Sequence, residues 1–190
     1  MPTSLEPLEE LTLQAYGCEA CKLCQTRTTV VFGDGNPNAD IIFIGEAPGE
    51  QEDESGIPFV GRSGQLLSKM LDVCLGLTRD DVYIANIVKC RPPENRDPEG
   101  DEIVACLGYL KKQIQIIQPR VLVTLGRFAT QALLETEERI GKLRGKEFVY
   151  EGIPLVPSWH PSYLLRRPMS RNDTVKDMKI VQEILAKPLT

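Results

Sequence analysis

Four short runs of apolar residues, rich in isoleucine and valine, recur along the chain and are separated by segments with helical spacing. The runs are Ile41–Ile44, Val82–Ile87, Val121–Leu125 and Leu155–Pro157. Continuous apolar runs of this length are typical of strands buried on both faces, as in a parallel sheet covered by helices. The pattern therefore predicts an α/β fold, a three-layer sandwich in which helices flank a mainly parallel, four-stranded central sheet.

Three segments between and after these runs repeat apolar residues with a helical period. We expect Ser63 to cap the first helix, and Asp97 to cap the second with Pro98 in its first turn. The third helix follows Asn172-Asp173 and ends near Pro188. The apolar positions are Leu66, Leu67, Met70, Leu71 and Cys74 in the first, Ile103, Leu107, Leu110, Ile114 and Ile117 in the second, and Val175, Met178, Val181 and Leu185 in the third.

Length and composition set the scale of the protein. A chain of 190 residues with 42% apolar composition suits one globular domain, and we predict a single, monomeric domain over residues 1–190. The first ten residues are acidic where a secretory signal would be basic and apolar. No apolar run approaches the roughly 20 residues that cross a bilayer. We therefore expect a cytoplasmic protein without a membrane segment.

The net charge of −5 argues at first against a nucleic-acid partner. The charge is unevenly distributed, however. Residues 1–60 carry 11 acids against two bases, which leaves 20 bases against 16 acids on residues 61–190. Basic residues gather at 139–146 and again at 166–171, where a solvated surface and a phosphate-binding surface are equally consistent with the sequence.

Six cysteines suit a metal site better than disulfides, because a cytosolic chain keeps its thiols reduced. Two form a C-x2-C pair, a third begins the loop after a predicted strand, and a fourth lies in the following helix. These four are Cys18, Cys21, Cys90 and Cys106. They predict one centre, zinc or [4Fe-4S], to which the N-terminal segment of about residues 1–30 contributes. Cys24 is an alternative ligand, whereas Cys74 lies on an apolar helix stripe and is expected to be buried.

In open parallel sheets, ligands bind at the carboxyl ends of the strands, so the loops after the predicted strands are the candidate site. These loops hold Gly45-Glu46-Ala47-Pro48-Gly49, then Gly56-Ile57-Pro58-Phe59-Val60-Gly61, Asn86, and His160-Pro161-Ser162-Tyr163-Leu164-Leu165-Arg166. A glycine-rich turn alone is common in nucleotide-binding loops. Together with the four cysteines, in order and at compatible spacing from Cys18 to Arg166, these motifs resemble the family 4 uracil-DNA glycosylases.

The resemblance implies a base excision repair enzyme that flips uracil out of DNA and hydrolyses its N-glycosidic bond, leaving an abasic site. It implies that Phe59 stacks on the base and that the Asn86 amide pairs with uracil N3–H and O4. It assigns to His160 the stabilisation of negative charge on O2 of the departing uracil. The uracil-binding residues implied are Gly45, Glu46, Ala47, Phe59, Asn86 and His160, with the backbone N–H groups of Glu46 and Ala47 assisting at O2.

Ala47 occupies a position where related glycosylase families carry Asp or Asn. We therefore expect another carboxylate in or just after the Gly45–Gly49 loop to activate the water. We expect Glu52 to position the water, with Glu46 as the second choice. Glu52, Glu46 and His160 are thus the expected catalytic residues.

The resemblance further implies DNA contacts through Ser162, Leu164 and Arg166, with an apolar side chain filling the space that a flipped base leaves. A leucine pair at this point is equally consistent with core packing. For the cysteines it implies a [4Fe-4S] cluster rather than zinc. The cluster is expected to serve structure, since hydrolysis of this bond needs no redox step.

Two other functions remain open. One is a non-catalytic zinc or iron-sulfur module that binds nucleic acid. The other is the related group that captures uracil-DNA covalently through a histidine in a basic insertion after the Asn-bearing strand. This chain runs directly from Asn86 to Cys90 and has one histidine, which favours turnover over capture.

Overall fold

The computed structural model describes residues 5–188. Within this range, six strands form one sheet in the order β1-β3-β2-β4-β6-β5. The strands are β1 (Asp34–Gly35), β2 (Ile41–Gly45), β3 (Tyr83–Asn86), β4 (Val121–Leu125), β5 (Phe148–Tyr150) and β6 (Ile153–Ser158). The predicted α/β class and mainly parallel sheet are confirmed. The predicted number of four strands is wrong, because β1 and β5 add short antiparallel strands at the two edges.

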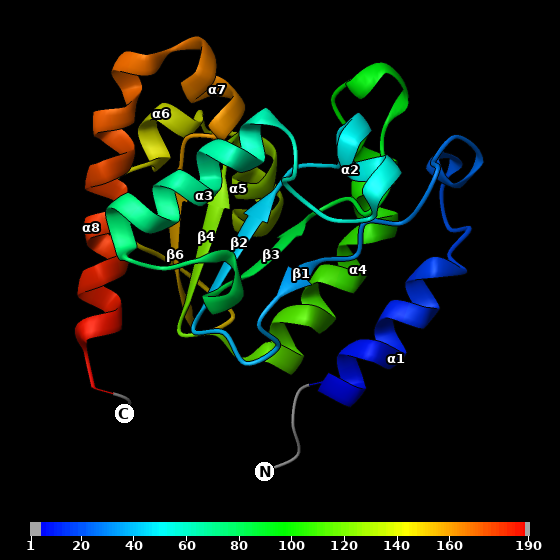
Figure 1. Ribbon diagram of the computed structural model, residues 1–190, viewed down its shortest axis with the longest axis horizontal. Helices are drawn as coiled ribbons and strands as arrows, with labels where there is room; N and C mark the ends of the chain where they lie inside the picture. The colour runs from blue at the N-terminus through cyan, green and yellow to red at the C-terminus, as the bar shows by residue number, and fades with distance from the viewer. Residues whose placement is uncertain (1–4, 189–190) are drawn as a thin grey trace.

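Helices cover both faces of the sheet, which confirms the three layers (Figure 1). Successive residues of β2 point to opposite faces, so Ile42 packs in a core with α1, α4 and α5, whereas Phe43 packs in a core with α3 and α8. The helices are α1 (Leu5–Tyr16), α2 (Glu50–Ser55), α3 (Arg62–Leu75), α4 (Gly100–Ile117), α5 (Arg127–Leu134), α6 (Ile140–Leu143), α7 (Pro161–Arg166) and α8 (Arg171–Ala186). Short 3-10 turns are η1 (Lys22–Gln25), η2 (Arg79–Asp81), η3 (Pro93–Asn95) and η4 (Pro168–Ser170).

No helix within residues 5–188 is both long and apolar enough to span a membrane. The predicted single domain also included residues 1–4 and 189–190, which lie outside the described residues.

The predicted cap of α4 is wrong. The helix begins at Gly100, and its capping box joins Glu99 to Glu102 instead of using Asp97. Glu102 is fully buried there and is neutralised by Arg96, whose Nη2 lies 2.6 Å from its Oε1. Asp97 therefore does not cap the helix. It forms an ion pair with Arg127 at the pocket described below.

The start of α3 also differs from the prediction. Gly61 is the N-cap residue, and its N–H is bound by the Glu52 carboxylate, so Ser63 lies inside the first turn and lines the pocket. The last helix, α8, begins one residue before the predicted Asn172-Asp173 because it follows η4 directly.

The four parallel strands place the candidate loops together. β3, β2, β4 and β6 run in the same direction, so their carboxyl ends share one edge of the sheet. Gly45 pairs with Asn86 at this edge, and Leu125 pairs with Ser158 two residues before His160. Segments more than 100 residues apart in the chain therefore converge on one place.

Candidate active site

A pocket of about 720 Å³ opens at the carboxyl ends of the parallel strands. Its lining brings together every loop that the sequence singled out. The predicted residues that line it are Glu46, Ala47, Glu52, Phe59, Asn86, His160, Ser162 and Arg166. Gly45 lies directly beneath, in contact distance of Asn86 and Phe59.

Asn86 forms the floor of the pocket. Its side chain is 1% exposed, and its Oδ1 has no hydrogen-bond partner among the described residues. A buried acceptor without a partner costs free energy, which is recovered when a ligand donates to it. A Cβ on Gly45 would lie 2.3 Å from Asn86 Oδ1 and 2.5 Å from Phe59 Cζ, so this position requires glycine.

Phe59 stands over the same space in a strained conformation. Its φ of 55° is unusual for a residue with a Cβ, and it is held there by close packing of Gly64 against its backbone. Arg79 donates from Nη1 to the carbonyl of Phe59 at 3.0 Å and from Nη2 to that of Pro58 at 2.8 Å. The loop is therefore rigid before any ligand enters.

His160 faces Phe59, with ring centroids 5.6 Å apart. Its Nδ1 accepts the backbone N–H of Ser162 at 3.1 Å and lies 2.8 Å from the Ser162 hydroxyl. Because Nδ1 accepts, the proton of the neutral ring is on Nε2. Burial, assisted by the positive charge of Arg166, lowers the pKa of His160 to about 4. The imidazole is thus a neutral donor at physiological pH.

A buried ion pair supports the strand that leads to His160. Asp177 on α8 accepts from the Ser158 hydroxyl at 2.7 Å and from Nε of Arg144 at 3.2 Å. Asp177 is fully buried, and burial raises its pKa while these donors oppose that shift. Removing one partner of such a pair leaves an uncompensated buried charge, so the network fixes the end of β6.

Glu46 is the carboxylate with the most perturbed environment in the pocket. Burial raises its pKa to about 7, and the negative charge of Asp97 adds to this while Arg127 opposes it. Asp97 and Arg127 pair with each other at 2.6 Å on the rim. A carboxyl group with a pKa near neutrality is suited to acid or base chemistry.

Glu52 lines the pocket and also holds a neighbouring loop by hydrogen bonds. Its Oε1 accepts the backbone N–H groups of Val60 at 2.9 Å and Gly61 at 2.8 Å. These bonds join α2 to the Phe59 loop and complete the N-terminus of α3. One carboxylate oxygen of Glu52 is therefore occupied by backbone donors.

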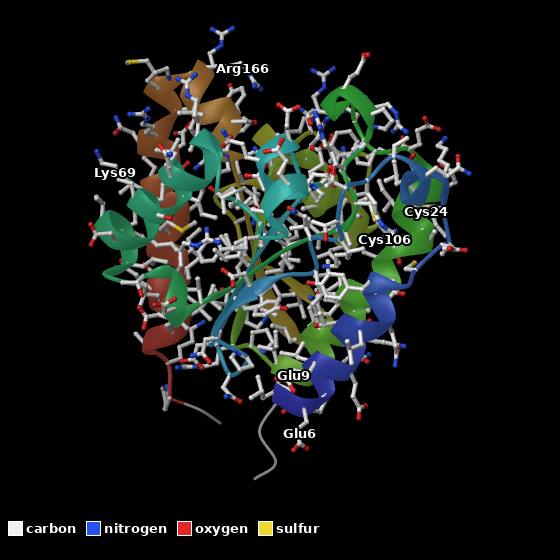
Figure 2. All side chains as sticks on the ribbon, turned by 45° about the vertical axis from the view of Figure 1, so that its right-hand side comes forward. Glu6, Glu9, Cys24, Lys69, Cys106 and Arg166 are labelled. Atoms are coloured by element: carbon white, nitrogen blue, oxygen red, sulfur yellow. The ribbon has the colours of Figure 1, made fainter. Side chains whose placement is uncertain are left out.

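The segment after His160 is the short helix α7, not an open loop. Leu164 has no exposed surface, so the core role that the sequence left open is the one observed, and Leu164 is not available as a wedge in this conformation. Arg166 is exposed and points outward at the end of α7 (Figure 2). Ser162 binds His160 and so orients the imidazole.

The sequence analysis missed Asp97 and Arg127 as pocket residues, and it gave Trp159 and Tyr163, beside His160, no role of their own. Asp97 was interpreted as a helix cap, and Arg127 follows a strand-end glycine to which no role was assigned. Trp159 stacks on Tyr163 with centroids 4.5 Å apart, and both line the pocket. Their position next to His160 in the chain was the available signal.

Five cysteines line a second, smaller cavity, which shares no lining residue with the first pocket. They are Cys18, Cys21, Cys24, Cys90 and Cys106, and Figure 2 shows Cys24 and Cys106 on the same side of the molecule. Arg27 donates from Nη1 to Cys90 Sγ at 3.4 Å, and burial raises the pKa of Cys106 to about 11. Within residues 5–188, no three His, Cys, Asp or Glu side chains are arranged closely enough to hold a metal ion. Cys74 is partly buried on α3, apart from this group.

Comparison with known proteins shows the family of the chain. Residues 32–184 match the family model of the uracil DNA glycosylase superfamily. A type-4 uracil-DNA glycosylase of Sulfurisphaera tokodaii is 46% identical over 97% of this chain and 87% of its own length. Those of Archaeoglobus fulgidus and Thermotoga maritima are 40% and 46% identical, over 96% and 87% of the chain and 96% and 87% of their own lengths.

The chain belongs to the uracil DNA glycosylase superfamily. The full-length matches to type-4 enzymes confirm the resemblance that the motifs carried, and with it a uracil-DNA glycosylase function in DNA repair.

Proposed function

We propose that the pocket binds a uracil flipped out of DNA, hydrolyses its bond to the sugar and leaves an abasic site. The observation that supports this most directly is the buried Oδ1 of Asn86, which lacks a donor among the described residues and lies in the pocket that Phe59 and His160 also line. Uracil N3–H is a donor for this acceptor, and the Asn86 amide N–H matches O4. Phe59 supplies the stacking face.

The neutral His160 is suited to stabilising the uracil as it leaves. Breaking the glycosidic bond puts negative charge on O2 of uracil, and a fixed Nε2–H donor stabilises that charge as it develops. Ser162 holds the ring through Nδ1, so no reorganisation is needed during the reaction. The backbone N–H groups of Glu46 and Ala47 are proposed to assist.

Glu46 is proposed to orient the attacking water and to stabilise the cationic sugar when ionised. With a pKa of about 7, this carboxyl is mostly protonated below neutrality and ionised above it. Glu52 then serves mainly to hold the Phe59 loop.

Replacing Glu46 with glutamine tests this role. The single-turnover excision rate of the wild type should rise between pH 6 and pH 8, and Glu46→Gln should lose that rise and be roughly tenfold slower at pH 8. Below pH 6 the two rates should converge, because the wild-type carboxyl is then protonated. An unchanged pH profile in the variant would remove Glu46 from the reaction.

A uracil-excision assay separates the proposed activity from the two alternatives. Incubation with a uracil-containing oligonucleotide should give an alkali-sensitive abasic product with several turnovers per enzyme. No product at stoichiometric enzyme would indicate a binding module. A denaturation-stable protein–DNA complex would indicate covalent capture.

The cysteine cavity is proposed to hold a structural [4Fe-4S] cluster, with zinc as the alternative. The described side chains are not gathered around one metal ion, but five cysteines line one cavity, which suits the larger cluster better than zinc. N–H donors from Arg27 and Lys89 reach Sγ atoms of Cys90 and Cys106. Such donors stabilise cluster thiolates. The proposed ligands remain Cys18, Cys21, Cys90 and Cys106, with Cys24 beside them. When bound, the cluster supplies a cross-link between the N-terminal segment and α4.

A pair of cysteine variants tests the ligand set. Cys106→Ser should lower bound iron and visible absorbance to less than half of the wild-type values. Cys74→Ala, a matched change on another helix, should retain both and cost about 1 kcal/mol of stability or less. Stoichiometric zinc without iron in the wild type would exclude the cluster.

DNA contact is proposed at Ser162 and Arg166, with Arg167 and Arg171, which follow closely in the chain, also exposed. Cationic side chains there would meet phosphates around the flipped base. A cytoplasmic location is proposed because a thiolate site needs a reducing compartment, and no disulfide is present among the described residues. The protein is proposed to act as a monomer.

A further inference from the structure

Lys89 is a buried lysine between the uracil pocket and the cysteine cavity. Its side chain is 1% exposed, which is rare for lysine and requires hydrogen-bond partners. Nζ donates to the backbone carbonyl of Asn86 at 2.8 Å and to Oε1 of Gln113 at 2.6 Å. The residue thus reaches back three positions to hold the peptide that carries the proposed uracil reader.

The backbone of the same residue belongs to the cysteine cavity. The Lys89 N–H donates to Cys106 Sγ at 3.2 Å, and Lys89 and the adjacent Cys90 both line that cavity. The Lys89 carbonyl accepts the N–H of Val31 at 2.8 Å, which fixes the peptide on its other side. Cys106 therefore contacts the Lys89 peptide directly, with no residue between them.

Gln113 makes this connection rigid. While its Oε1 accepts from Lys89, its Nε2 donates to the carbonyl of Phe32 at 3.0 Å and to the Tyr83 hydroxyl at 3.1 Å. Gln113 is fully buried on α4, the helix that also carries Cys106. Every polar atom of the connection named here is paired, as expected of a network that fixes one geometry.

We propose that Lys89 is a positioning residue that couples the cysteine site to uracil recognition. Its Nζ holds the Asn86 peptide by a hydrogen bond, and its backbone N–H donates to Cys106 Sγ. The state of the cysteine site then controls uracil affinity, although no cysteine lines the uracil pocket. The inference rests on the proposed roles of Asn86 and of the cysteine site.

The test is Lys89→Met, which keeps the length of the side chain and removes the donor. Binding of free uracil, measured by calorimetry on the iron-containing protein, should weaken about tenfold. The KM for uracil-DNA should rise similarly, while the single-turnover rate at saturating DNA should fall less than threefold. Ile114→Val, beside Gln113 in the same core, should lower the melting temperature slightly without changing uracil affinity.

Gln113→Met gives a second measurement if Lys89→Met does not fold, and should weaken uracil binding about threefold. Cys106→Ser should weaken uracil binding as well, although it lines no part of the uracil pocket. Wild-type uracil affinity in the folded Lys89 and Gln113 variants would overturn the coupling. If the wild type itself fails to bind uracil, it is the proposed function that fails.

Discussion

Replacing His160 with alanine should slow uracil excision by roughly a hundred- to a thousandfold, the range found when one preorganised oxyanion donor is removed. The imidazole is neutral, is fixed through Nδ1 and faces Phe59, so its Nε2–H is available where charge develops on uracil O2. Single-turnover kinetics at saturating DNA would measure the loss directly. The effect should fall on the rate more than on DNA affinity.

Ser162→Ala is the matched control for this variant. It removes the hydroxyl at 2.8 Å from Nδ1 but leaves the backbone N–H at 3.1 Å, so the ring keeps its tautomer and the rate should fall less than tenfold. A loss below tenfold in His160→Ala would contradict the proposed role. The lowered pKa also predicts that acidification from about pH 6.5 to pH 4 destabilises the wild type, because the unfolded chain binds the proton more readily. His160→Ala should lose that contribution.

Asn86→Asp should reduce kcat/KM for uracil-DNA on the order of a thousandfold, since a site built to hydrogen-bond its ligand discriminates strongly against mismatched groups. An ionised aspartate retains an acceptor for N3–H but offers O4 no donor, and its charge is buried where the amide was 1% exposed. The affinity for free uracil should fall in parallel.

Asn36→Asp provides the comparison for this change. Asn36 lies in the turn after β1, where its Oδ1 accepts the N–H of Asn38 at 2.9 Å, a bond that aspartate preserves. The activity of the Asn36→Asp variant should match that of the wild type. If Asn86→Asp retained full uracil affinity while folded, Asn86 would not be the uracil reader.

Strong local signals made the central fold predictable. The runs that form β2, β3, β4 and β6 are mostly apolar, and β4 begins and ends where the sequence indicated. The edge strands β1 and β5 have two and three residues, too few to produce a run. Their pairing depends on neighbours that only the folded sheet supplies.

The candidate site was predictable to the extent that motifs define it. Asn86, Phe59 and His160 converge because parallel strands end at one edge. The burial and the bonding partners of each side chain could not be predicted from the motifs. The bonds from Glu52 to the Phe59 loop, the burial of Leu164 and the pairing of Asp97 with Arg127 all depend on residues distant in the chain.

At Phe59 the cost of a positive φ is set against the burial of the ring. A non-glycine residue in this backbone region costs on the order of 1–3 kcal/mol, which glycine would largely avoid. Deleting the ring would cost about 3–5 kcal/mol, because Phe59 is 7% exposed and packs in the core with Leu67 and Leu71. The burial of the ring thus outweighs the strain, and stability and the proposed stacking on an extrahelical base both favour an aromatic residue at position 59.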